Sequence, residues 1–154
     1  MTVTAHDLAE YRILAGVSDE HLQLIADSSS EVRFGTDERI LSTDEPADHF
    51  YLIRSGRVAI EIDAPGRTTI VIETISALDV VGVSWLLPPH RWTFDATALE
   101  AVTAIEVDAV ALRAACEIDP ALGYALYTRF AVLLHERLVA TRIRALDLYG
   151  ATTS

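Results

Sequence analysis

Short apolar runs recur through the middle of the chain, between residues 31 and 108, and polar turn residues separate them. The runs are rich in β-branched residues, and most end at glycine, proline, aspartate or serine, which is typical of antiparallel strands. Ser55-Gly56 and Pro65-Gly66 predict two hairpin turns, because glycine adopts positive φ without strain. About eight strands at this spacing indicate a mainly β fold, a sandwich or barrel. We expect them at residues 32–34, 39–41, 50–54, 58–62, 68–75, 80–81, 93–99 and 102–107.

A helical pattern precedes the β region, over residues 8–27. Ser18 is a favourable N-cap residue within it, and Asp19 and Glu20 follow where negative charge complements the helix dipole. We therefore expect an N-terminal helix that covers one side of the β region.

A second helical region follows the strands, over residues 109–149. It predicts a short helix over 109–117 and a long helix that begins at Asp119 and Pro120, since proline is favourable in a first helical turn. We expect one domain over residues 1–150, made of the N-terminal helix, the β region and these two helices. Residues 151–154 form a short tail.

The long helix carries two apolar stripes. The first consists of Leu122, Leu126, Phe130 and Leu133, and we expect it to pack on the β region. The second steps in a heptad-like way with small residues at three positions, which favours a homodimer seam. The alternative is one wide stripe packed inside the monomer. The second stripe consists of Tyr127, Ala131, Leu134, Leu138, Thr141, Ala145 and Leu148.

The segment from Gly82 to Ala98 is the strongest candidate for chemistry. A glycine ends a strand, a short apolar turn follows, two prolines stop it, and Arg91 stands at the entry to the next strand. A short helix with outward backbone N–H groups beside a guanidinium suits a small anion such as a phosphate. The alternative is a plain strand connection with a surface arginine. Period-two alternation predicts Trp92, Phe94, Ala96 and Ala98 on one face of that strand, against Thr93, Asp95 and Thr97.

Composition narrows the classes of function. The chain has 154 residues, 51% of them hydrophobic, and a formal net charge of -11. So acidic a chain does not bind nucleic acid non-specifically, and we expect no direct DNA binding. Cys116 is the single cysteine, so no intramolecular disulfide forms. Without a visible signal peptide or an apolar run of spanning length, we expect a cytoplasmic protein that does not enter a membrane.

Catalytic and metal-binding patterns are weak. Ser84 has no nearby base in the sequence, so we expect no enzyme activity. The histidines show no ligand spacing, and we expect neither a metal site nor a cofactor. The five histidines are His6, His21, His49, His90 and His135.

The order of helix, strands, short helix and long helix resembles the cyclic-nucleotide-binding domain of the catabolite-activator/FNR-type (CRP/FNR) regulators. The most specific match is the segment from Asp44 to Val58, in which an aromatic-apolar strand ends in Ser-Gly. This resemblance implies a double-stranded β-helix or jelly-roll barrel with a long C-terminal dimerisation helix. The segment from Trp85 to Phe94 resembles a stand-alone subgroup of this fold, without the C-terminal helix-turn-helix.

In that family the Gly82–Ala98 segment corresponds to the phosphate-binding cassette. Gly82 matches the family pattern, but Val83 stands where a glutamate binds the ribose hydroxyl. Trp92 stands at the arginine position, with Arg91 one residue early, and Asp95 replaces a small or hydroxyl residue. The resemblance implies a ligand site made of Gly82, Val83, Ser84, Trp85, Arg91, Trp92, Thr93 and Arg137.

Three functions are compatible with these observations. The first is a sensor that binds a small anion, with cyclic AMP or cyclic GMP as the candidate nucleotides, and signals to a protein partner through the long helix. The second is a ligand-free dimerising scaffold whose pocket is filled by Trp85 or Trp92, which the substitutions at Val83 and Asp95 favour. A third function, transcription control, requires assembly with a chain that reads DNA.

Overall fold

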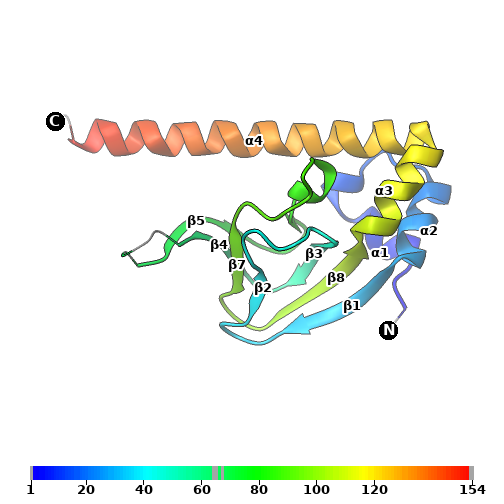
Figure 1. The fold of residues 1–154 in the computed structure, drawn as a ribbon, viewed down its shortest axis with the longest axis horizontal. Helices are drawn as coiled ribbons and strands as arrows, with labels where there is room; N and C mark the ends of the chain where they lie inside the picture. The colour runs from blue at the N-terminus through cyan, green and yellow to red at the C-terminus, as the bar shows by residue number, and fades with distance from the viewer. Residues whose placement is uncertain (1, 64–65, 67, 153–154) are drawn as a thin grey trace.

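Two four-stranded antiparallel sheets form a β-roll, and a long helix lies across one end of it (Figure 1). This computed structural model describes residues 2–63, 66 and 68–152, with backbone alone for residues 148–152. The prediction of a mainly β, jelly-roll fold is confirmed, and the strands lie within a few residues of their predicted positions. The strands are β1 (Ser29–Phe34), β2 (Arg39–Leu41), β3 (His49–Ser55), β4 (Val58–Ile62), β5 (Ile70–Ile75), β6 (Val80–Val81), β7 (Asp95–Ala98) and β8 (Val102–Asp108).

The two sheets have the strand orders β1-β8-β3-β6 and β2-β7-β4-β5. One face of each sheet turns toward the shared core, while β3 and β6 are buried along most of their length. The predicted turn at Gly56 joins β3 to β4, and Gly56 has φ +94°. Gly66 also has positive φ, while the preceding Pro65 lies outside the described residues. The turn at Ser55-Gly56 is present, but it is not a hairpin, because β3 and β4 belong to different sheets and do not pair. β4 and β5, on either side of Gly66, do pair antiparallel, as the second predicted hairpin requires.

The predicted N-terminal helix over residues 8–27 is wrong as one element. The chain forms α1 (Ala5–Ala9), a 3₁₀ turn η1 (Arg12–Leu14) and α2 (Asp19–Asp27). Gly16 has φ +83°, a conformation that no helix interior accepts. The buried Tyr11 hydroxyl donates a hydrogen bond to the Ile53 carbonyl at 2.9 Å, which ties the break to the β-roll. Ser18 does cap α2, and its hydroxyl accepts from the His21 amide.

The C-terminal helices agree with the sequence pattern. They are α3 (Ala109–Ile118) and α4 (Pro120–Thr152). The first stripe of α4 packs on the roll, and its members Leu122, Leu126 and Phe130 are buried. Phe130 meets Phe50 and Trp85 edge-on, and those two rings stack with centroids 4.6 Å apart. This aromatic cluster joins α4 to the roll. Among the described residues, none of the helices has both the length and the apolar character needed to cross a bilayer.

The predicted strand over residues 93–99 begins later, at Asp95. Ala96 and Ala98 are buried as expected, but Phe94 is exposed and Asp95 is buried. The alternation fails at this point because residues 93 and 94 form a bend rather than a strand. Asp95 is buried without a large cost because three polar groups, two of Thr43 and one of Arg39, contact its carboxylate.

Candidate ligand-binding site

A cavity of about 450 Å³ opens between the β-roll and the second half of α4, beside Gly82. Its roll wall comes from β4, β5 and the segment after Gly82, and its other wall is one face of α4. This volume lies within the usual range for small-molecule sites. The lining residues are Leu41, Ile60, Ile62, Ile72, Glu73, Gly82, Val83, Ser84, Trp92, Thr93, Phe94, Asp95, Leu134, Arg137, Leu138, Thr141 and Arg144.

Gly82 shapes the floor of this cavity because the Trp92 ring lies directly on it. A Cβ at Gly82 would come within 2.7 Å of the Trp92 ring, and the backbone there has φ +101°. Both the close approach and the positive φ require glycine. The pair therefore fixes where the strand β6 ends and where the indole lies.

Arg137 joins the two walls. Its guanidinium donates to the Val80 carbonyl at 2.7 Å and to Asp79 Oδ1 at 3.2 Å. Its Nε lies 3.5 Å from Glu73 Oε1. The side chain is only 18% exposed, so these contacts are partly shielded from water. Arg137 is thus a strut from α4 to β5 and β6.

Asp95 is the buried carboxylate of the cavity wall, at 6% exposure. Burial by itself would raise the pKa of Asp95. The backbone amide and hydroxyl of Thr43 donate to its Oδ1 at 2.7 and 3.0 Å, and Arg39 lies 3.1 Å away. These contacts outweigh burial and lower the pKa of Asp95, so the carboxylate is ionised and compensated at neutral pH.

Two predicted site residues lie outside the cavity. The Arg91 guanidinium donates to the Asp44 carbonyl. The Arg91 backbone forms an isolated antiparallel β-bridge with Pro46, on the loop before β3. Trp85 is fully buried in the aromatic cluster with Phe50 and does not line the cavity. Arg91 therefore holds a loop in place here, and Trp85 belongs to the core.

The other six predicted residues do line the cavity: Gly82, Val83, Ser84, Trp92, Thr93 and Arg137. The Ser84 and Thr93 hydroxyls lie 3.3 Å apart and hydrogen-bond each other. Val83 presents a side chain that accepts no hydrogen bond. The structure thus brings together most of the predicted phosphate-binding cassette, but not Arg91.

Sequence reasoning missed the contribution of α4 to this wall. Leu134, Leu138, Thr141 and Arg144 line the cavity, together with the predicted Arg137. Their spacings of three and four residues place them on one helix face. The sequence contains this signal, but the heptad-like pattern predicts a homodimer seam for three of these residues, Leu134, Leu138 and Thr141.

Several residues of the predicted seam thus have neighbours within the protomer, and the homodimer seam stays a prediction. Leu134, Leu138 and Thr141 face the cavity, and the Tyr127 hydroxyl donates to the Leu86 carbonyl at 3.2 Å. The side chain of Leu148 lies outside the described residues. With 3.6 residues per turn, the opposite face of α4 carries another apolar stripe, which is exposed among the described residues, although Val132 within it also lines the smaller cavity described below. Its members are Val132, Val139, Ile143 and Leu146.

The short turn η2 (Ser84–Leu86) connects the cavity to both C-terminal helices. Arg113 of α3 donates to the Trp85 carbonyl at 2.8 Å and to the Ala47 carbonyl at 3.0 Å. Tyr127 of α4 binds the Leu86 carbonyl, as noted above. This turn is therefore hydrogen-bonded to both α3 and α4.

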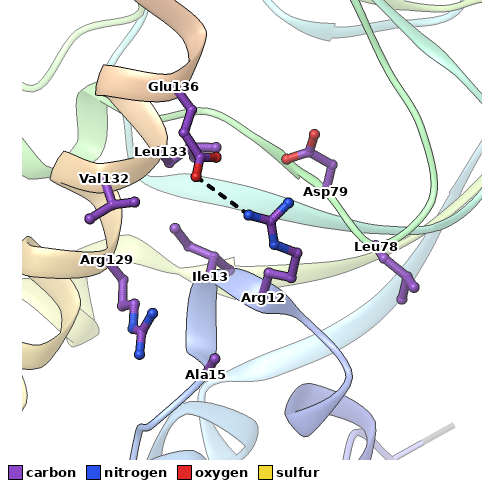
Figure 2. Close-up of a pocket in the computed structure, with 9 residues that line it drawn as sticks. All are labelled: Arg12, Ile13, Ala15, Leu78, Asp79, Arg129, Val132, Leu133 and Glu136. Carbon is purple, nitrogen blue, oxygen red and sulfur yellow. Dashed lines mark hydrogen bonds and ion pairs between the residues drawn. The ribbon is translucent and has the colours of Figure 1, made fainter.

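A smaller cavity of about 230 Å³ lies between η1, the turn before β6, and α4 (Figure 2). Arg12 and Glu136 form an exposed ion pair across it at 3.4 Å. Asp79 lines this cavity and also binds Arg137 of the larger one. No cluster of three or more histidine, cysteine or acidic residues suited to a metal occurs in the part of the chain that the structure describes.

Comparison with known proteins places this geometry in a family. Residues 31–119 match the cyclic nucleotide-binding domain family. A CRP-like cAMP-activated global transcriptional regulator of Mycobacterium tuberculosis is 28% identical over 106 residues. The alignment covers 69% of this chain and 47% of the regulator, so the chain spans about half the length of the curated relatives it matches.

Solved structures agree with the fold. A candidate cyclic nucleotide-binding protein from Geobacter metallireducens is 29% identical with a TM-score of 0.81, covering 88% of this chain and 98% of that one. The Thermus thermophilus catabolite activator protein is 19% identical with a TM-score of 0.70, covering 90% and 63%. The second likeness concerns the fold alone. Because the family match covers more than half of the sequence, the chain belongs to the cyclic nucleotide-binding domain family.

Proposed function

We propose that this chain is a regulatory domain that binds a small anionic ligand between the β-roll and α4 and reports occupancy through α4. The observation that carries the proposal is the cavity beside Gly82, whose two walls belong to different elements. A ligand that contacts both walls stabilises one position of α4 over others, and this is the requirement for a signal.

Cyclic AMP and cyclic GMP are the first ligands to test, because the family and the regulator of M. tuberculosis are named for cyclic nucleotides. Four cassette positions that the resemblance implies, Gly82, Val83, Ser84 and Thr93, line the cavity. Arg137 reaches the cavity from α4, and the contacts of η2 with Arg113 and Tyr127 give a route from the ligand to the helices.

The free stripe of α4 is the surface that would pass the signal on. Its members follow a heptad, since seven residues separate Val132 from Val139 and Val139 from Leu146. A heptad is the spacing at which two helices pack along each other. We propose that a second copy of the chain covers this stripe, so that a shift of α4 changes the packing of two protomers or the surface a protein partner meets.

Isothermal titration with cyclic AMP and cyclic GMP tests the proposal. Val83→Glu restores an acceptor for the ribose hydroxyl, and one good charged hydrogen bond raises affinity roughly ten- to a hundred-fold. Thr93→Trp places an indole in the cavity and abolishes binding. Val110→Trp on the exposed side of α3 is the matched control and leaves binding unchanged. A flat titration of Val83→Glu at millimolar nucleotide would contradict nucleotide binding in this cavity.

The ligand-free scaffold remains the second candidate, favoured by Arg91 lying outside the cavity and by Val83 in place of an acceptor. It predicts that Thr93→Trp changes neither ligand response nor assembly. Sedimentation of the wild type and of Thr93→Trp, with and without nucleotide, separates the two functions.

A further inference from the structure

The walls of the large cavity expose apolar surface that a sugar or phosphate would not cover. Ile62 and Phe94 are each 40% exposed, and Leu138 is 49% exposed, although all three line the same cavity. Leu41, Ile60, Ile72 and Leu134 extend this surface. Apolar surface in a concave site gains most from an apolar occupant, since water is released from both partners.

Most polar side chains that line the cavity already bind neighbouring residues, although Arg137 Nε makes no hydrogen bond and only lies near the Glu73 carboxylate. Thr43 and Arg39 bind the Asp95 carboxylate, and the Ser84 and Thr93 hydroxyls pair. Arg137 is bound to Asp79 and to the Val80 carbonyl. A ligand rich in hydroxyl groups would leave donors unpaired here, and an unpaired buried donor weakens binding strongly.

Arg144 differs from the other charged residues of the lining. Its one hydrogen bond among the described residues is to Thr141 of the same helix, at 3.4 Å, and no carboxylate of that part of the chain lies within ion-pair distance. In a chain of net charge -11, such a cation at the edge of an apolar cavity attracts an anionic group.

From these three observations we propose that the ligand is a small organic monoanion with an apolar body, such as an aliphatic or aromatic carboxylate. Its body lies against Ile62, Phe94 and Leu138, and its anionic group meets Arg144. This inference rests on the proposed function and names the ligand class of the same site.

A small molecule is the occupant, rather than a second copy of the chain. The free stripe of α4 that suits a second copy lies on the opposite side of the helix from Leu134 and Leu138, as its spacing requires. A helix packed there does not fill the cavity. The volume of about 450 Å³ is that of a small-molecule site.

Three probes test the ligand class on the full chain: decanoate, decanol and cyclic AMP, each titrated by calorimetry. Tryptophan fluorescence provides a second readout because Trp92 lines the cavity. We expect decanoate to bind about tenfold tighter than decanol, because both share the apolar body and only decanoate carries the charge. We also expect decanoate to bind at least tenfold tighter than cyclic AMP.

Variants locate the two ends of the ligand. Arg144→Gln lowers decanoate affinity about tenfold and leaves decanol unchanged. Arg142→Gln is the matched control, since Arg142 lies on the same helix and does not line the cavity, and it leaves both affinities unchanged. Thr93→Trp abolishes binding of decanoate and decanol, whereas Val110→Trp does not.

The outcomes separate the two proposals. Tighter binding of cyclic AMP than of decanoate overturns the ligand class and leaves the proposed function standing. Equal effects of Arg144→Gln and Arg142→Gln, or decanoate binding that survives Thr93→Trp, also overturn this inference. If the wild type binds none of the probes and Val83→Glu gains no affinity for cyclic AMP, the proposed function itself fails.

Discussion

The two walls of the cavity are held in place by different means. On the roll wall, Asp95 has three polar partners and Gly82 lies beneath the Trp92 ring, so each position is set by buried contacts. On the α4 wall, Leu138, Thr141 and Arg144 are exposed. Among the described residues, the hydrogen bonds that tie this half of α4 to the roll are those of Arg137.

This contrast indicates which wall responds to a ligand. Segments with few buried contacts open at low free energy, whereas a close-packed wall does not adjust by small amounts. Under the proposed function, we therefore expect a ligand to meet a preformed surface on the roll and to change the position or the mobility of α4. The first half of α4 packs on the roll through Phe130, and we expect it to act as the pivot of that change.

The largest expected effect is loss of that pivot. Phe130→Ala removes a fully buried ring from the cluster with Phe50 and Trp85, and we expect a loss of about 3–5 kcal/mol in unfolding free energy. Urea denaturation followed by circular dichroism measures it. Tyr124→Ala on the exposed side of the same helix is the control and costs less than about 1 kcal/mol. Equal losses in the two variants would show that α4 is not anchored by this cluster.

The next effect tests the roll wall. Asp95→Asn removes the charge that Arg39 and Thr43 stabilise, and we expect a loss of about 1.5–3 kcal/mol at pH 7. Since the pKa of Asp95 is lowered in the folded chain, its stabilisation is present above the unfolded pKa of about 3.8 and fades as the pH falls below that value. Denaturation at pH 7 and at about pH 3 measures both.

The difference between wild type and Asp95→Asn should therefore shrink on acidification. Asp63→Asn, on an exposed residue whose carboxylate binds Thr69, is the control and shows a small difference at both pH values. A difference for Asp95→Asn that stays constant between the two pH values would contradict the ionised, compensated carboxylate.

The same contrast separates what the sequence predicts from what it does not. The strands and the Leu122–Phe130 stripe were predictable, because period-two and helical spacing report directly on burial against a roll. Arg91 and Phe94 were not, because a bend after two prolines breaks the alternation on which their faces depended.

The faces of α4 posed a different difficulty. Leu138 and Val139 are both apolar and adjacent, so spacing alone permits either to face a partner. Only the position of the roll beneath the helix decides that Leu138 lines the cavity. Likewise, the alternation places Asp95 on the polar face of its strand, and only the contacts with Thr43 and Arg39 explain its burial.

A smaller effect is expected at the strut between the walls. Arg137→Met removes the hydrogen bonds to Asp79 and Val80 but keeps the length of the side chain, and we expect a loss of about 1–2 kcal/mol. Amide hydrogen exchange should rise over residues 138–147 before it rises in the roll. Arg142→Met is the matched control. Unchanged exchange in that segment would mean that Arg137 does not hold α4 to the roll.

The smallest effect on stability is expected at two adjacent residues that separate ligand binding from assembly. Leu138→Asp and Val139→Asp each replace a half-exposed side chain, so each changes the unfolding free energy of the monomer by no more than about 0.5 kcal/mol. Their side chains point roughly 100° apart around the helix, one to the cavity and one toward the free stripe.

Their functional effects should therefore differ in kind. If a second copy covers the free stripe, the sedimentation coefficient of Val139→Asp falls to that of a monomer while decanoate binding persists, because a charge in a helix seam is costly to bury. Leu138→Asp keeps its assembly state and loses decanoate binding, because the new carboxylate faces the cavity. If Leu138→Asp dissociates the dimer and Val139→Asp does not, the seam follows the heptad of the sequence, and the α4 wall belongs to the interface rather than to a ligand.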